Sequence, residues 1–277
     1  MRKEKTYFWI AFLLVGLLLA LNALLLCLRE DGDALDVYQR FTVCIDAGHG
    51  GVDGGVTGVN TGVKESDLNL SVSRLLKEHF ESCGITVVMT RKTKDGLYGT
   101  ATSGFKRRDM EKRREIIEQS KPDMVISIHM NKYSSPSRSG PQVFFLEKGC
   151  AGEALAVSLQ NALNKFTGNS HSALSGDYFI LKCTESPSVI VECGFLSNAE
   201  DERKLSDKEY QDYFRGGDDV YVFRQFALTS FIFIHRLKIT IRGGRKYAKY
   251  ELFSQTAKIG VKIQKSAVKA GSFHKKA

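Results

Sequence analysis

The stretch from Phe41 to Gly51, FTVCIDAGHGG, decides the fold class of this 277-residue chain. Its first five residues are apolar or β-branched, which predicts a buried strand at 41–45. The glycine-rich residues that follow, up to Gly62, predict a long loop. A strand without alternating polar residues is typical of a sheet that is covered on both faces. The loop at the end of such a strand is a candidate functional site.

Strands and helices alternate along the chain beyond this stretch. Short apolar runs predict strands, and amphipathic or charged stretches of about 10 to 15 residues between them predict helices. This alternation predicts an α/β fold with a mixed, largely parallel central sheet that has helices on both faces. The further strands are expected at 85–89, 124–128, 143–146 and 189–191, and the helices at 68–79, 106–120 and 155–163.

The composition excludes several classes of protein. With 43% hydrophobic residues the chain can bury a sizeable core. Six cysteines without a Cys-x-x-Cys pair suggest neither a disulfide scaffold nor a zinc ribbon. The net charge of +9 comes entirely from the carboxyl-terminal tail, residues 212–277, which contains 14 basic and 4 acidic residues. Residues 1–211 are nearly neutral, with 26 basic and 27 acidic residues. We therefore expect no nucleic-acid partner, and the basic tail at 212–277 stays unassigned.

The amino end predicts one transmembrane helix. Residues 7–28 carry no charge, and as a helix they would span about 33 Å, enough to cross a bilayer core. Arg2, Lys3 and Lys5 precede this segment, so residues 1–6 are expected in the cytoplasm and the chain after the linker at 29–40 outside the membrane. A cleaved signal peptide, which would make the protein secreted, is the alternative. A small-residue cleavage site is not evident, which favours a retained anchor.

Polar residues stand where the predicted parallel strands end, which is where such sheets bind ligands. His49 follows the first strand, His129 the strand at 124–128, and Glu192 the strand at 189–191, while Glu65 opens the first helix. Alone, each histidine is more often a hydrogen-bonded structural residue, and Glu65 fits the preference of glutamate for a helix N-terminus. Glu192 differs, because a carboxylate after a buried apolar strand is costly unless it is paired or functional. Together, two histidines and a carboxylate with an open fourth position form the ligand set of a catalytic zinc. A second carboxylate for proton transfer completes a site for metal-assisted hydrolysis.

Four blocks of sequence resemble the signature blocks of the amidase-3 family, the zinc-dependent N-acetylmuramoyl-L-alanine amidases. They are Val43–Gly51 (VCIDAGHGG), Glu65 with the helix after it, Ser127–Asn131 (SIHMN) and Val191–Asn198 (VECGFLSN). They occur in the family's order and predict a catalytic domain at 41–211. The resemblance implies zinc ligation by His49, Glu65 and His129, with Glu192 as the catalytic carboxylate.

The resemblance also implies a substrate and a setting. The substrate bond is the amide between the lactyl group of N-acetylmuramic acid and L-alanine in peptidoglycan. One anchor followed by a single catalytic domain is similar to the germination-specific branch of the family, which acts on spore cortex. There, peptide removal precedes formation of muramic-δ-lactam, and a separate deacetylase is expected to supply the other step.

Further candidate residues have simpler alternatives. Asn131, two residues after His129, is placed to lie beside the metal or to contact substrate. The alternative is that it only forms a turn at the end of its strand. Arg91 and Arg113 resemble basic positions near the family's cleft, although Arg113 on a charged helix equally fits a solvent-exposed position. Cys44 and Cys193 flank the site in sequence and are expected to be small buried hydrophobic residues.

Two questions stay open from the sequence. The tail is a basic module, a disordered appendage or a translation in an altered reading frame, and the abrupt change of composition favours the last. The function is that of an amidase, of another zinc peptidase or deacetylase of the wall, or of a non-catalytic wall-binding domain. The presence of all four site residues argues against a decayed enzyme.

Overall fold

The computed structural model describes residues 41–215. They form a six-stranded sheet in the order β2-β1-β3-β6-β4-β5. β1 is parallel to β2 and β3, β3 is parallel to β6, and β4 is antiparallel to β6 and parallel to β5. The prediction of a mixed, largely parallel sheet is confirmed. The strands are β1 (Thr42–Ala47), β2 (Thr86–Met89), β3 (Met124–Asn131), β4 (Gln142–Phe145), β5 (Leu174–Ser175) and β6 (Ser188–Phe195).

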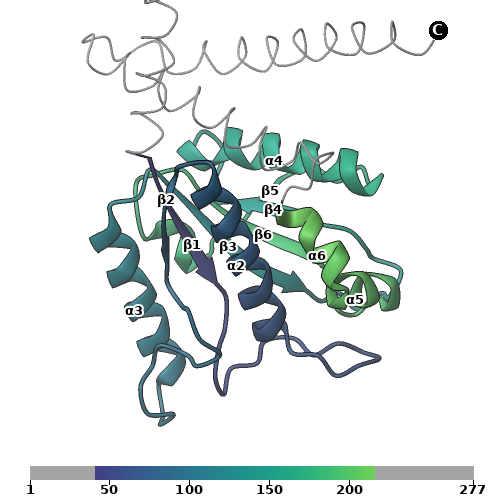
Figure 1. Cartoon of the computed structure of the whole chain (residues 1–277), viewed down its shortest axis with the longest axis horizontal. Coiled ribbons are helices and arrows are strands. Elements are labelled where there is room, and N and C mark those ends of the chain that lie inside the picture. The colour runs from purple at the N-terminus through teal and green to yellow at the C-terminus, as the bar shows by residue number, and fades with distance from the viewer. Residues whose placement is uncertain (1–40, 216–277) are drawn as a thin grey trace, which may run out of the picture.

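The described residues contain five α-helices and one short 3-10 helix, of which α5 and α6 follow the last strand (Figure 1). The predicted helices are confirmed with wider bounds, and two helices after β6 were not predicted. The helices are α2 (Glu65–Ser82), α3 (Phe105–Ser120), α4 (Ala151–Thr167), η1 (Phe179–Lys182), α5 (Ala199–Ser206) and α6 (Lys208–Arg215).

Hydrophobic cores lie on both faces of the sheet, so the predicted cover on both faces is confirmed. In β1, Val43 and Ile45 face one core and Cys44 faces the other, as successive side chains of a strand must. The larger core contains apolar residues of α2, α4 and α5. The smaller core contains Ile117 of α3 and Ile180 of η1. Both faces of the central strands are therefore dry, which explains their continuous apolar sequences.

The sheet order places the strands with the predicted site residues side by side. β1, β3 and β6 are consecutive neighbours, and all three are parallel. In the β3–β6 register, His129 stands opposite Glu192. Polar residues that follow three separate strands along the sequence thus meet at one edge of the sheet.

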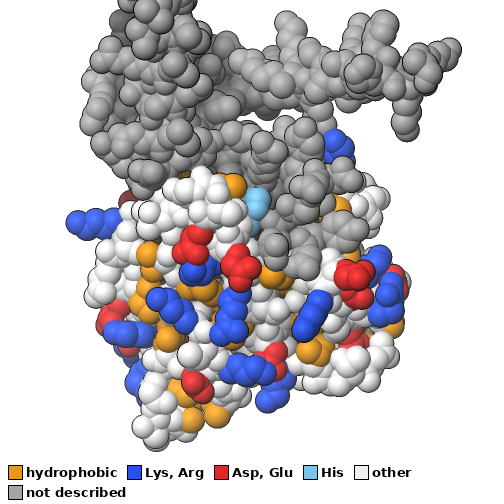
Figure 2. All heavy atoms as spheres, in the orientation of Figure 1, with side chains coloured by type: hydrophobic (Ala, Val, Ile, Leu, Met, Phe, Trp, Pro, Cys, Tyr) orange, Lys and Arg blue, Asp and Glu red, His pale blue; other side chains and the backbone are white. Residues whose placement is uncertain are grey.

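The membrane prediction concerns residues that the structure does not describe. Between residues 41 and 215, no helix has both the length and the apolar character needed to cross a bilayer. The predicted transmembrane helix at 7–28, the linker at 29–40 and nearly all of the basic tail lie outside the described residues. On the face shown in Figure 2, acidic and basic side chains are interspersed, which fits the near-neutral charge of residues 1–211.

Candidate active site

The loop after β1 carries His49 in an unusual backbone conformation. His49 has a φ of 59°, in the left-handed region that residues other than glycine seldom adopt. Two hydrogen bonds from Arg113 of α3 hold the loop: Nη1 donates to the Ala47 carbonyl at 2.8 Å and Nη2 to the His49 carbonyl at 2.6 Å. Such conformations persist where surrounding contacts fix them, and they concentrate at functional sites.

Gly48 allows the loop to lie directly against the His129 ring. A Cβ atom at position 48 would lie 2.3 Å from both Cε1 and Nε2 of His129. This is far inside van der Waals contact, so a larger residue requires the ring to move. The glycine next to His49 therefore permits the two histidines to approach, and their ring centroids lie 5.0 Å apart.

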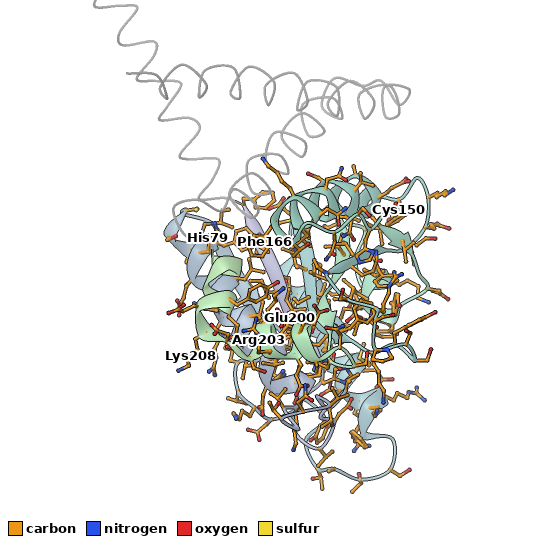
Figure 3. All side chains as sticks on the ribbon, turned by 90° about the vertical axis from the view of Figure 1, so that its right-hand side faces the viewer. His79, Cys150, Phe166, Glu200, Arg203 and Lys208 are labelled. Atoms are coloured by element: carbon orange, nitrogen blue, oxygen red, sulfur yellow. The ribbon has the colours of Figure 1, made fainter. Side chains whose placement is uncertain are left out.

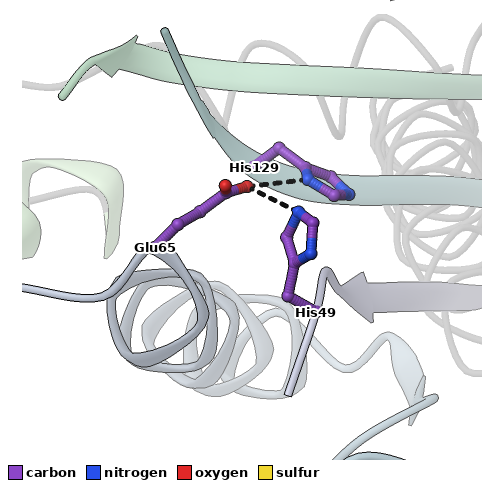
Figure 4. A group of neighbouring side chains, drawn as sticks. All are labelled: His49, Glu65 and His129. Carbon is purple, nitrogen blue, oxygen red and sulfur yellow. Dashed lines mark hydrogen bonds and ion pairs between the residues drawn. The ribbon is translucent and has the colours of Figure 1, made fainter. Parts of the chain in front are cut away.

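Glu65, at the start of α2, brings the two histidines together (Figure 4). Its Oε1 atom lies 2.9 Å from Nδ1 of His129 and 3.2 Å from Nε2 of His49. The side chain is 2% exposed, and its Oε2 atom accepts a hydrogen bond from the Val56 amide at 2.8 Å. Nδ2 of Asn69, one turn further along α2, donates to Oε1 and also to the Gly48 carbonyl. These contacts fix the carboxylate with one oxygen toward both rings.

The charges of this cluster favour a bound cation. Burial alone would raise the pKa of Glu65, but hydrogen bonds and charge interactions with His129 and His49 hold it well below its usual range. Burial alone would lower the pKa of His49, but Glu65 and Asp53 raise it to about 9. The lowered pKa keeps the Glu65 carboxyl ionised, and the raised pKa of His49 shows that the two carboxylates favour positive charge at its ring.

Asp53 is a residue of this site that the sequence analysis missed. Its Oδ2 atom lies 3.0 Å from Nδ1 of His49, so the other ring nitrogen, Nε2, faces Glu65. Its Oδ1 atom lies 3.4 Å from Nζ of Lys106. A carboxylate on the far nitrogen of a histidine is the usual way in which a metal-binding histidine is oriented. A carboxylate four residues after a candidate histidine was the available signal in the sequence.

Glu192 has a buried carboxylate oxygen that receives no hydrogen bond from any described residue. Its Oε2 atom is shielded from solvent and lacks a hydrogen-bond partner within residues 41–215. Burial raises the pKa of this carboxyl to about 7. A buried carboxylate without a partner is costly unless it has a function. Glu192 stands opposite His129 in the register of β3 and β6, which places it next to this candidate ligand.

The donor atoms of the cluster fit a divalent transition metal. The candidate ligand atoms of His49, Glu65 and His129 all lie within 4.8 Å of one another. Among residues 41–215, no other group of three His, Cys, Asp or Glu side chains is placed to hold a metal ion. Two imidazole nitrogens and one carboxylate oxygen match the three protein ligands of a catalytic metal site. The structure thus brings together all three predicted ligands.

Arg91 and Arg113 lie beneath this site and are each 1% exposed. The guanidinium of Arg91 donates to the carbonyls of Ala47, Gly48, Thr93 and Ser66. Arg113 also pairs with Asp46 and Asp109, each at 2.6 Å. The alternative that Arg113 is a solvent-exposed helix residue is wrong, because these two carboxylates compensate its charge inside the protein. Both arginines hold the His49 loop, and their contact with substrate stays a prediction.

Asn131 lies half-buried at the end of β3, where its side chain makes a local contact. Its Oδ1 atom accepts a hydrogen bond from the amide of Lys132 at 2.7 Å, which fits the turn-forming alternative. Its contact with metal or substrate stays a prediction. Cys44 and Cys193 are buried, 0% and 2% exposed, as expected for small hydrophobic residues.

Comparison with known proteins supports the interpretation of this geometry. The sequence profile of the amidase-3 family, described as N-acetylmuramoyl-L-alanine amidase, matches residues 43–217. The germination-specific N-acetylmuramoyl-L-alanine amidase of Bacillus subtilis (strain 168) is 32% identical over 176 residues, which cover 61% of this chain and 73% of that protein.

Solved structures give the same result. The CwlD amidase of Clostridioides difficile, solved in complex with the GerS lipoprotein, has a TM-score of 0.62 and 30% identity, covering 67% of this chain and 98% of that one. The catalytic domain of the amidase CwlV from Bacillus (Paenibacillus) polymyxa var. colistinus has a TM-score of 0.56 and 26% identity. This match covers 63% of the present chain and 92% of the CwlV domain. The chain therefore belongs to the amidase-3 family of N-acetylmuramoyl-L-alanine amidases, which are hydrolases of peptidoglycan.

Proposed function

We propose that the chain is a zinc enzyme that cleaves the amide between the lactyl group of N-acetylmuramic acid and L-alanine of the stem peptide. The observation that carries this proposal is the convergence of His49, Glu65 and His129 beside Glu192, whose Oε2 atom has no hydrogen-bond partner among residues 41–215. Amidase activity on peptidoglycan comes with the family. Zinc and the catalytic role of Glu192 are the additions made here.

His49, Glu65 and His129 would hold the zinc ion through the nitrogen and oxygen atoms that already face one another. When bound, zinc supplies a positive charge that polarises a carbonyl and lowers the pKa of water. Imidazole and carboxylate ligands without thiolates suit a catalytic rather than a structural site. Asp53 fixes the orientation of the His49 ring, and Arg113 fixes the backbone of His49.

Glu192 performs the proton transfers. Burial raises its pKa to about 7, so its carboxyl accepts and returns a proton near neutral pH. Oε2, which forms no hydrogen bond within residues 41–215, takes a proton from the attacking water. The same oxygen then delivers this proton to the nitrogen of the leaving L-alanine, which departs as an amine when the amide bond breaks. Water and the amide are consumed, and a lactyl carboxylate and a free amino group are formed.

The biological setting is a separate part of the proposal. We place the enzyme in maturation of spore cortex, where peptide removal precedes muramic-δ-lactam formation with a deacetylase in the same pathway. The resemblance to a germination-specific relative supports this setting. The uncharged residues 7–28 support a membrane anchor with the catalytic domain outside the cytoplasmic membrane.

Muropeptide analysis tests the enzymatic part. The purified full chain is incubated with cortex peptidoglycan and with vegetative peptidoglycan, and new amino groups of L-alanine are quantified. We expect such groups to appear, to vanish with a chelator and to return with zinc. Glu192→Gln is expected to retain zinc and to lose activity by about 100-fold or more, whereas Glu200→Gln on the exposed side of α5 is a control. Release of acetate would indicate a deacetylase, and binding without any product would indicate a wall-binding module.

A further inference from the structure

The loop between Asp53 and α2 forms a short hairpin, residues 57–64, whose base contacts Glu65. Thr57 and Lys64 form an antiparallel bridge, and the Gly58 amide donates to the Val63 carbonyl at 2.9 Å. At the base, the Glu65 amide donates to the Val56 carbonyl at 2.8 Å, and the Val56 amide donates to Oε2 of Glu65 at 2.8 Å. The hairpin base thus binds one oxygen of Glu65 and leaves the other toward the histidines.

The tip of the hairpin binds a second buried carboxylate, that of Glu202 on α5. Glu202 is 0% exposed. Its Oε2 atom accepts from the Asn60 amide at 2.8 Å, and its Oε1 atom accepts from the amide and the hydroxyl of Thr61, both at 2.7 Å. A Cβ atom at Gly58 would lie 2.4 Å from Oε1, so the hairpin closes tightly over the carboxylate.

The helix that carries Glu202 is itself well anchored. The side chain of Asn198 caps α5 by accepting hydrogen bonds from the amides of Glu200 and Asp201. Glu200 and Arg203 pair on the exposed side of the helix (Figure 3). Glu202 therefore offers a fixed point to which the tip of the hairpin is attached.

From these contacts we infer that Glu202 is a positioning residue for the metal centre, acting on Glu65 through the hairpin 57–64. This inference rests on the proposed function, because it assigns Glu202 a role in binding zinc. Without Glu202, the tip amides of Asn60 and Thr61 lose their acceptor. The hairpin then fluctuates, and Val56 holds the Glu65 carboxylate less well. Residues that orient a metal ligand contribute about 10- to 100-fold to metal affinity.

Asp201 provides a matched control on the same helix. It is also buried, and its Oδ2 atom accepts from the amides of Gly140 at 2.7 Å and Phe195 at 2.9 Å. Among the described residues, neither Gly140 nor Phe195 bonds to Glu65 or to the hairpin, whereas Leu196, next to Phe195, accepts one hydrogen bond from the Val59 amide at 3.3 Å. Asp201→Asn thus removes a buried carboxylate of α5 and leaves in place the hydrogen bonds that Glu202 accepts from Asn60 and Thr61.

The experiment measures zinc affinity and hairpin opening separately in the full chain. Zinc affinity is obtained by competition with a chromophoric chelator, and opening is obtained from hydrogen exchange of peptides that contain Val56 in the metal-free protein. For Glu202→Gln we expect about tenfold weaker zinc binding and faster exchange at Val56. Thr61→Val, a milder change that removes only the hydroxyl bond, is expected to shift both quantities in the same direction. Asp201→Asn is expected to leave both near the wild-type values.

Three results would overturn the inference: wild-type zinc affinity in Glu202→Gln, unchanged exchange at Val56, or equal losses of affinity in Glu202→Gln and Asp201→Asn. If Glu202→Gln does not fold, Thr61→Val decides by the same two readouts. A wild-type chain that binds no zinc would contradict the proposed function. In that case, exchange at Val56 in the variants still decides whether Glu202 controls the hairpin.

Discussion

Arg113 donates a hydrogen bond from Nη2 to the backbone carbonyl of His49, at 2.6 Å, from beneath the loop that carries this histidine. The same guanidinium pairs with Asp46 and Asp109 inside the protein. The charged side chain of Arg113 thus fixes the backbone at His49, whose φ of 59° is unfavourable for a residue other than glycine. The loop of the active site is therefore maintained by a buried ion network.

Arg113→Ala is expected to destabilise the fold strongly. The change leaves the carboxylates of Asp46 and Asp109 buried without their partner, and such a loss costs about 3–5 kcal/mol. Urea unfolding of the metal-free protein measures the free energy. Arg107→Ala, which removes an 85% exposed side chain paired with Glu111, is expected to leave the free energy of unfolding near the wild-type value. Equal stability of the two variants would contradict the buried network.

Asp46 predicts a loss of stability in acid. Burial alone would raise its pKa, but Arg113 and the hydroxyls of Ser127 and Thr90 lower it from 3.8 to about 2. Because the folded-state pKa lies below the unfolded one, the stabilisation is complete above about pH 4 and disappears as the pH falls through 2. The shift corresponds to about 2 kcal/mol.

The pH dependence of unfolding in wild type and Asp46→Asn measures this contribution. The wild type is expected to lose about 2 kcal/mol more than the variant between pH 5 and pH 2. The variant retains the other titrating groups, whose effects cancel in the difference. Parallel stability curves for the two proteins would show that Asp46 does not titrate as described.

Asp53→Asn is expected to weaken zinc binding without unfolding the protein. The change removes the negative charge beside Nδ1 of His49, which orients the ring toward Glu65. We expect a loss of affinity of about 10- to 100-fold, measured by calorimetry or chelator competition. Asp67→Asn, which breaks an exposed pair with Lys94, is the control. An affinity equal to that of the control would remove Asp53 from the site.

Gly48→Ala is expected to weaken zinc binding without lowering the stability of the fold. The added methyl group would lie 2.3 Å from the end of the His129 ring, so the ring must turn away from Glu65. Zinc affinity is expected to fall by about tenfold or more, whereas the melting temperature of the metal-free protein changes little. Gly54→Ala is the control, since its Cβ would meet only the flexible Lys64 side chain at 3.3 Å. Unchanged zinc affinity in Gly48→Ala would contradict the described position of His129.

The sheet and the principal site residues were predictable because their signals are local. Buried parallel strands have continuous apolar sequences; His49 follows β1, and His129 and Glu192 come after the apolar runs of β3 and β6, within strands that extend further than predicted. The order of strands then brings these residues to one edge of the sheet. The pattern of the sequence and the geometry of the fold agree here because each residue is placed by its own strand.

The contacts of Arg113 and Glu202 were not predictable, because their partners are distant in the sequence. Arg113 lies on a strongly charged helix, and its burial depends on Asp46, which is 67 residues earlier. Glu202 contacts the amides of Asn60 and Thr61 across more than 140 residues. An acidic residue in the first turn of a helix has a sufficient local explanation, so nothing in the sequence indicates the second role of Glu202.

Zinc stoichiometry tests the central claim most directly. The metal content of the purified full chain is measured by equilibrium dialysis and elemental analysis, for wild type and for His49→Ala, Glu65→Ala and His129→Ala. One zinc ion per wild-type chain is expected, with loss of tight binding in each variant, because in the proposed centre all three side chains would contact the same ion. Full zinc occupancy in any variant that remains folded would contradict a shared metal centre.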